Sequence, residues 1–207
     1  MTALLWNRAT NPAALLVLAH GAGAPMDSDF METLAQGLAE NGISVVRFEF
    51  PYMQRRREDG KKRPPNPAGQ LLAHFQSVVE TVADPALPVW VGGKSMGGRM
   101  ASMLAAQQMA NIAGVAAFGY PFHPPGKPEK TRTEHLPQLL VPMLVCQGQR
   151  DPFGKPDEVS GYGLPEQVHL HWLTAGDHDF KPLKASGLDQ QTLIAEAAEH
   201  TATFIRG

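Results

Sequence analysis

Residues 93–97 read Gly-Lys-Ser-Met-Gly, the pattern G-x-S-x-G. An apolar run enters this segment and a helical pattern follows it, as at the sharp strand-to-helix turn that carries a nucleophilic serine. Small residues beside the serine let strand and helix approach closely, and the positive end of the helix faces a developing oxyanion. The pattern predicts that Ser95 is a nucleophile. A serine that only caps the helix is the alternative.

The tripeptide Gly93, Lys94 and Ser95 also matches the end of a phosphate-binding loop. That loop requires a glycine five positions before Gly93, and Pro88 stands there. The residues between them, 89–91, are apolar and have the character of a strand. The sequence therefore disfavours nucleotide binding.

A serine hydroxyl needs a histidine within hydrogen-bond reach and a carboxylate that sets the histidine tautomer. The chain has eight histidines. His178 follows the last apolar run, in a loop at the carboxyl edge of the expected sheet, where sites form in such folds. We expect His178 to be the base. A solvated loop histidine between Asp177 and Asp179 is the alternative.

The carboxylate that we expect beside His178 is Asp151. It leaves the penultimate apolar run shortly after a glycine and is followed by Pro152. Asp157, Asp177 and Asp179 remain alternatives, but a carboxylate adjacent in sequence to His178 reaches its far ring nitrogen with difficulty.

The first long apolar run ends in residues 20–23, His-Gly-Ala-Gly. This small-residue turn lies at the same expected edge as Ser95. We expect the N–H groups of Ala22 and Met96 to form an oxyanion hole, because a tetrahedral intermediate needs two donors. A tight turn that only leads into the next helix is the alternative.

The sequence offers little to hold a metal. His169 and His171 stand two apart and would share one face of a strand, but no third ligand is identifiable. Cys146 is the only cysteine, which excludes an internal disulfide and fits a reducing compartment. His74 and His200 lie in helical patterns. We expect strand packing for the paired histidines, no metal and no organic cofactor.

Short apolar runs of strand length alternate with amphipathic segments, which favours an α/β domain. The expected strands are 13–18, 44–50, 89–91, 114–118, 143–146 and 168–173, and the expected helices are 29–41, 68–83, 98–109 and 190–205. Most of the runs are continuous rather than alternating, as in a sheet covered on both faces. We predict a three-layer α/β/α sandwich with a mostly parallel, doubly wound sheet. A length of 207 residues favours one domain, 1–207.

Two local features refine this prediction. Asp29 and Glu32 have the spacing of a capping box at the start of the first helix, and Gly42 is its stop signal. The proline-rich segment 122–141 is long enough for a short cap over a site and too short for a second domain.

The composition indicates a soluble cytoplasmic protein. The apolar run 13–19 is at the short limit of a signal-peptide core and lacks a basic start, so we expect a strand there. No run reaches the length of a membrane span. The net charge of −2 gives no general attraction to nucleic acid or membrane.

Residues 54–66 form the most basic stretch, with six basic and two acidic side chains. This expected loop follows a strand and so lies at the edge of the proposed site. We hypothesise that it helps to hold an anionic acyl substrate through Arg55 and Arg56. A solvated loop is the alternative, and the lack of interleaved aromatic residues disfavours nucleic acid.

With these residues in hand, the chain resembles the α/β-hydrolase superfamily, in particular its small lidless branch. That branch includes dienelactone-hydrolase-like proteins and a group named for a testis-expressed protein and a chromatin acetyltransferase subunit. The resemblance rests on segments 20–23, 47–52, 92–99, 119–122, 148–151 and 177–180. It implies the α/β-hydrolase fold without a lid, with Ser95 as nucleophile, Asp151 as acid and His178 as base. A dienelactone hydrolase proper would carry cysteine as nucleophile, so its substrate is not implied.

The sequence thus predicts a serine hydrolase that cleaves an ester or related acyl bond of a small molecule through an acyl-enzyme. We place further substrate contacts at His20, Arg55, Arg56, Tyr120 and Phe122. The rival interpretation is a non-catalytic interaction module that keeps the fold, because the resembling group includes scaffold subunits. An intact set of Ser95, Asp151 and His178 weighs against that rival.

Overall fold

A computed structural model describes residues 3–108 and 111–207. Its centre is a seven-stranded sheet in the order β1-β3-β2-β4-β5-β6-β7. The strands are β1 (Leu4–Asn7), β2 (Ala14–Ala19), β3 (Ile43–Phe48), β4 (Val89–Lys94), β5 (Ile112–Phe118), β6 (Met143–Gly148) and β7 (Val168–Leu173). Strand β1 pairs antiparallel with β3, and every other pairing is parallel. The carboxyl ends of six strands therefore meet at one edge.

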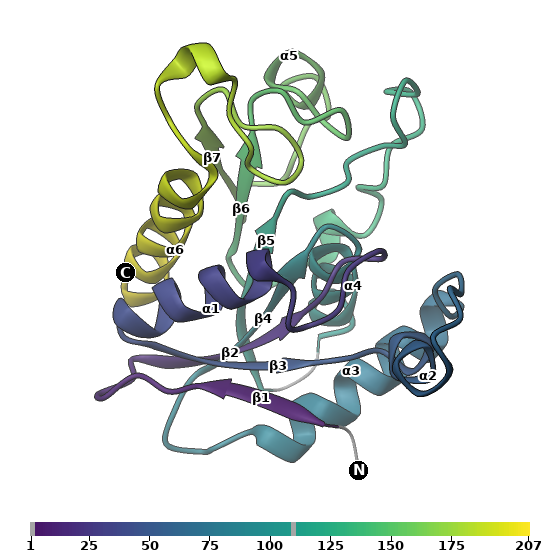
Figure 1. Ribbon diagram of the computed structural model, residues 1–207, viewed down its shortest axis with the longest axis vertical. Helices are drawn as coiled ribbons and strands as arrows, with labels where there is room; N and C mark the ends of the chain where they lie inside the picture. Colours follow the sequence, from purple (N-terminus) through teal and green to yellow (C-terminus); the bar gives the residue numbers. More distant parts are fainter. Residues whose placement is uncertain (1–2, 109–110) are drawn as a thin grey trace.

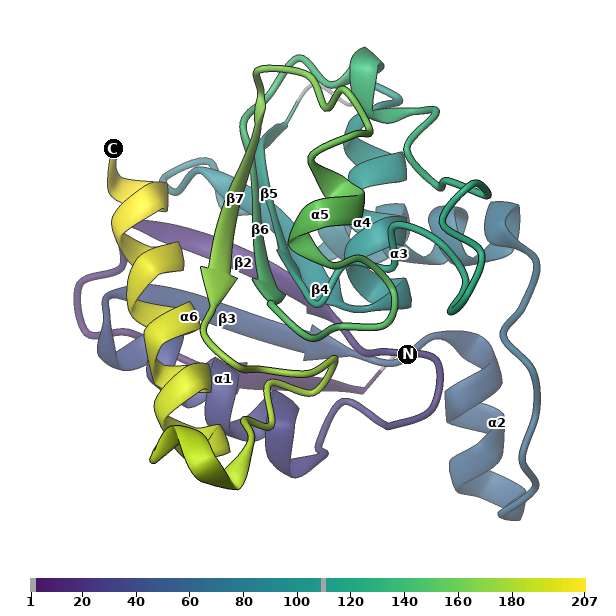
Figure 2. The ribbon, with the colours of Figure 1, turned by 90° about the horizontal axis from the view of Figure 1, so that it is seen from above.

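Helices cover both faces of the sheet (Figures 1 and 2). One face packs against α1 (Asp29–Glu40) and α6 (Gln190–Arg206), and the other against α3 (Ala68–Val82) and α4 (Met96–Ala105). Each face has its own apolar core, because β2 and β3 are buried over their whole length and alternate side chains enter opposite layers.

The predicted fold class is confirmed: the structure is a three-layer α/β/α sandwich without a separate lid. The six expected strands and four expected helices are present, with bounds that shift by a few residues. We did not predict β1, which is short and only half-buried and so lacks a strong apolar signal. Met109, the expected end of the helix 98–109, lies outside the described residues. The single domain over 1–207 stays a prediction.

Two local predictions were wrong. The basic stretch begins in a helix, α2 (Pro51–Asp59), rather than in a loop throughout. Pro51 at the first helical position and the left-handed Gly60 at its end delimit a segment of good helix formers. Glu32 also makes no capping box, since Ser28 is the N-cap and the Glu32 carboxylate pairs with buried Arg47 instead.

The segment 122–141 packs against the body of the protein. It includes a short 3₁₀ turn, η1 (Leu136–Gln138), and buries Leu136 and Leu139 in the same core as α4. Toward the C-terminus lie α5 (Pro156–Val159) and η2 (Lys184–Ser186). None of the helices in residues 3–108 and 111–207 is both long and apolar enough to cross a membrane.

Candidate active site

Ser95 stands between β4 and α4, in a backbone conformation that non-glycine residues rarely adopt. Its φ of 52° and ψ of −116° place it in the turn itself, and its N–H donates to the carbonyl of Phe118 at 3.0 Å. Glycines two positions before and after Ser95 allow this turn: a Cβ on Gly97 would lie 2.5 Å from the carbonyl oxygen of Ala19, and one on Gly93 would lie 2.6 Å from it. Backbone strain of this kind costs about 1–3 kcal/mol and marks functional turns.

Three side chains from separate segments meet at this turn. The Nε2 atom of His178 lies 2.9 Å from the Oγ atom of Ser95. The Nδ1 atom of His178 lies 2.8 Å from a carboxylate oxygen of Asp151. Because a carboxylate can only accept, Nδ1 carries the proton and Nε2 is left to accept from the serine hydroxyl.

Asp151 is fully buried, and its two carboxylate oxygens accept two further hydrogen bonds. The side-chain amide of Gln147 donates to one carboxylate oxygen at 3.0 Å, and the N–H of Phe153 donates to the other at 2.8 Å. The Phe153 ring also packs on the imidazole of His178, with centroids 4.4 Å apart. These contacts fix the carboxylate where it faces His178.

The loops that carry Asp151 and His178 are joined by their backbones. The N–H of Arg150 donates to the carbonyl of Gly176 at 2.8 Å. Gly148 permits this contact, because a Cβ there would lie 2.5 Å from the same carbonyl. The Asp177 carboxylate accepts from the N–H groups of Asp179 and Lys181 and closes the turn around His178.

The residues expected to supply the oxyanion donors belong to segments that border this turn. Met96 is the first residue of α4, so its N–H has no partner within the helix. Residues 21–24 line the cavity that contains Ser95 and His178. A Cβ on Gly21 would lie 3.8 Å from the Cβ of Ser95, which shows how closely this loop passes the serine.

The carbonyl groups of this loop are held from the side of α2. The Tyr52 hydroxyl lies 3.0 Å from the carbonyl oxygen of Ala22 and 3.4 Å from that of Gly21, and Arg56 donates to the carbonyl of Gly23 at 3.1 Å. In a trans peptide the C=O and the next N–H point in opposite directions. Fixing the Gly21 carbonyl toward Tyr52 therefore turns the Ala22 N–H the other way.

His20 supports the same loop from below. The N–H of Phe50 donates to its Nε2 at 3.1 Å, so Nδ1 carries the proton and donates to the Gly21 carbonyl at 2.6 Å. Burial lowers the pKa of His20, which keeps the ring neutral. His20 is thus enclosed beneath the loop rather than exposed to a substrate.

Replacing Tyr52 with phenylalanine is expected to lower kcat for ester hydrolysis about tenfold, the effect of one lost hydrogen bond. KM should change less than twofold, because the oxyanion is formed only in the transition state. Steady-state kinetics on a chromogenic ester measures both constants.

A matched control is Tyr162→Phe, which removes a hydroxyl that donates to the carbonyl of Pro128, away from the loop. Its kcat should match the wild type. Equal losses in the two variants would count against a specific role of Tyr52 in the oxyanion loop.

The cavity beside Ser95 has a volume of about 290 Å³. Its walls combine the oxyanion loop, the start of α1, the strand end and the His178 loop: Gly21, Ala22, Gly23, Ala24, Ser28, Phe30, Met31, Lys94, Ser95, His178 and Asp179. The Lys94 ammonium lies 3.3 Å from the carboxylate of Asp179. Sequence reasoning missed Lys94 as a wall residue, because the pattern G-x-S-x-G leaves that position free.

The structure places the five expected substrate contacts elsewhere. Tyr120 and Phe122 are fully buried in the core, and Arg55 is exposed on α2. His20 and Arg56 contact the oxyanion loop instead. Two of the six basic side chains of the stretch 54–66 are held in ion pairs, since Arg57 pairs with Glu49 and Asp27, and Arg63 pairs with Asp59.

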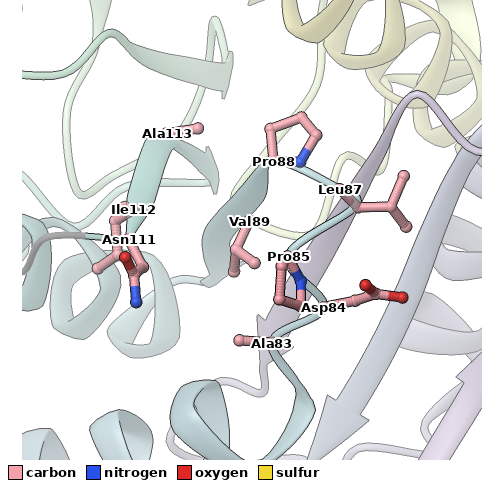
Figure 3. A pocket seen from close by; sticks show the side chains of 9 residues that line it. All are labelled: Ala83, Asp84, Pro85, Leu87, Pro88, Val89, Asn111, Ile112 and Ala113. Atoms are coloured by element: carbon pink, nitrogen blue, oxygen red, sulfur yellow. The ribbon is translucent and has the colours of Figure 1, made fainter.

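A larger cavity, of about 400 Å³, lies at the opposite edge of the sheet (Figure 3). It is formed where β4 and β5 begin and is lined mainly by proline and aliphatic side chains. Among the described residues that line this cavity, only Asp84 is ionisable. This cavity offers no nucleophile and no acid–base pair.

His169 and His171 of β7 both face α6, as expected for two side chains on one face of a strand. His171 stacks on His200 with centroids 3.8 Å apart, and its Nε2 lies 2.8 Å from a carboxylate oxygen of Glu196. His169 packs on Phe204. Within residues 3–108 and 111–207, no three His, Cys, Asp or Glu side chains are grouped so that they could hold a metal ion.

Residues 12–206 match the model of a family described as alpha/beta hydrolase domain. Among solved structures, dienelactone hydrolase from Anabaena variabilis has a TM-score of 0.73 at 20% identity, covering 95% of this chain and 88% of that one. A serine hydrolase without a lid from Xanthomonas campestris has a TM-score of 0.70 at 19% identity, covering 97% and 88%.

Est1E from Butyrivibrio proteoclasticus is also similar, with a TM-score of 0.71 at 12% identity, covering 98% of this chain and 93% of that one. Because these sequence identities are 20% or lower, the similarity to each solved structure shows a shared fold and no more.

Proposed function

The chain belongs to an alpha/beta hydrolase domain family, and from this premise we propose that it is a serine hydrolase that cleaves esters or related acyl bonds of small molecules. The observation that carries the proposal is the pair of contacts at 2.9 and 2.8 Å that link Ser95, His178 and Asp151. They join a strained, half-buried serine to an oriented imidazole in a cavity open to a substrate.

In the proposed first half-reaction, the Oγ atom of Ser95 attacks the carbonyl carbon while Nε2 of His178 accepts its proton. Asp151 stabilises the imidazolium that forms. The N–H groups of Ala22 and Met96 donate to the tetrahedral oxyanion. His178 then returns the proton to the leaving oxygen, and the acyl group stays on Ser95.

In the second half-reaction, His178 accepts a proton from water, which attacks the acyl-enzyme. The second tetrahedral intermediate collapses, Oγ regains its proton from His178, and the carboxylic acid leaves. All the groups required belong to this chain.

The volume beside Ser95 supports a small substrate, since about 290 Å³ is at the lower end of ligand cavities. A structure of the similar Est1E contains bound ferulic acid. We take from that neighbour only the expectation of a small-molecule acyl substrate for this chain.

Labelling with a small fluorophosphonate tests the proposal without knowledge of the substrate. We expect one adduct by intact mass, mapped by peptide analysis to Ser95, because only an activated serine reacts readily with this reagent. An unlabelled protein with intact circular dichroism, or an adduct on another serine, would contradict the proposal and favour a non-catalytic module.

A further inference from the structure

Lys94 brings a cation into the cavity beside Ser95. Its side chain is only 9% exposed, and its stem passes under the oxyanion loop, where a Cβ on Gly21 would lie 3.7 Å from the Lys94 Cγ. The ammonium ends 5.4 Å from the centre of the Phe30 ring. Among the described residues that line this cavity, Lys94 is the only lysine or arginine.

A buried ammonium is costly unless it is paired. Burial lowers the pKa of Lys94, and the carboxylates of Asp179 and Asp151 oppose this shift. The only carboxylate of the described residues within ion-pair distance is that of Asp179, at 3.3 Å. Asp179 lies at the rim with its side chain 56% exposed, so this carboxylate can turn into water at little cost.

The position of Lys94 also limits where a bound anion can lie. Lys94 and Ser95 are consecutive, so their Cα atoms are about 3.8 Å apart. A Cβ on Gly119 would lie 3.3 Å from Nζ of Lys94 and 3.4 Å from Nδ1 of His178, so the ammonium lies close to the imidazole that contacts Ser95. The same cavity is lined by the apolar residues Phe30 and Met31.

We propose that Lys94 determines substrate specificity and that the cavity selects short-chain esters whose acyl part ends in a carboxylate. The substrate carboxylate replaces that of Asp179 at the ammonium, and the ester carbonyl then lies at Ser95. This inference rests on the proposed hydrolase function. It moves the anion preference that we expected of Arg55 and Arg56 to a residue inside the cavity.

Two substrate pairs isolate the carboxylate. Monoethyl fumarate and ethyl crotonate differ by a carboxylate in place of a methyl group, and monoethyl adipate and ethyl hexanoate form a longer pair. The quantity to measure, by acid release in a pH-stat, is the ratio of kcat/KM for the anionic ester to that for the neutral ester. Two lengths are used so that chain length alone does not decide the result.

We expect the wild type to prefer the anionic ester in at least one pair. Lys94→Met should lower the ratio about 10- to 100-fold, the range for a lost charge-assisted hydrogen bond. Asp179→Asn should raise the ratio several-fold, because it removes the competing carboxylate. Lys184→Met, which removes an exposed lysine outside the cavity, is the charge-matched control and should keep the wild-type ratio.

The inference is overturned if the wild type shows no anionic preference in either pair, or if Lys94→Met and Lys184→Met have equal ratios. Asp179→Asn provides a second test should Lys94→Met fold poorly, since its side chain is exposed; an unchanged or lower ratio in that variant also overturns the inference. Fluorophosphonate labelling of Ser95 separates these outcomes from failure of the hydrolase proposal. If Ser95 is labelled but the enzyme does not prefer the anionic ester, the role of Lys94 is contradicted and the hydrolase proposal stands.

Discussion

Replacing Asp151 with asparagine is expected to lower kcat for ester hydrolysis about 10⁴-fold while the protein stays folded. The carboxylate accepts from Nδ1 of His178 at 2.8 Å and from Gln147 at 3.0 Å on the same oxygen. Asparagine has one acceptor oxygen where the carboxylate has two, so its amide nitrogen faces either the donors of His178 and Gln147 or the N–H of Phe153. It also removes the negative charge that stabilises the imidazolium formed when His178 accepts the serine proton.

Steady-state kinetics, with the fluorophosphonate labelling rate as a second reading, measures this loss. The control is Asp157→Asn, an exposed carboxylate on α5 that we considered as an alternative from the sequence. Its kcat should stay within about twofold of the wild type, as for other surface substitutions. A loss in Asp157→Asn that equals the loss in Asp151→Asn would remove Asp151 from the mechanism.

The second large effect is expected from Gly97→Ala, through backbone packing. The added Cβ would lie 2.5 Å from the carbonyl oxygen of Ala19 and 2.7 Å from that of His20. Both atoms belong to the backbone where β2 enters the oxyanion loop, so relief requires movement of that strand end or of Ser95. Overpacking of this kind costs about 1–3 kcal/mol.

For a chain of this length, such a cost lowers Tm by about 3–10 °C. The displaced serine should also react more slowly with fluorophosphonate. Differential scanning calorimetry and labelling kinetics measure the two effects.

Gly69→Ala is the matched control, because Gly69 lies in α3 and its added Cβ meets no atom within 4 Å. Alanine favours helix over glycine, so Tm should stay or rise slightly. A Gly97→Ala variant as stable as Gly69→Ala would show that the turn does not depend on close contact with β2.

Much of the architecture followed from local patterns. Most of the expected strands are continuous apolar runs, and the helix 29–41 combines an apolar stripe with a glycine stop. These patterns depend only on neighbouring residues in the sequence, so they can be recognised without knowing which segments pack together in the fold. The short strand β1 and the helix α2 carried weaker signals: β1 is half-buried, and the charged composition of α2 resembles a solvated loop.

The positions expected for Ser95, Asp151 and His178 followed from where they stand relative to the strand ends, because parallel strands deliver their carboxyl ends to one edge. Their contacts required the folded chain, since 83 positions separate Ser95 from His178.

By itself, the sequence determined the order of strands and helices and the edge at which the site lies, since both depend on periodicity and on glycine and proline positions. Only the tertiary structure decided which side chains line the cavity beside Ser95. It buried Tyr120 and Phe122, gave Arg56 and Arg57 partners within the protein and put Lys94 in the wall of the cavity. The reason is physical: the direction of a side chain at a strand end depends on distant segments packed around it, and no local pattern encodes that packing.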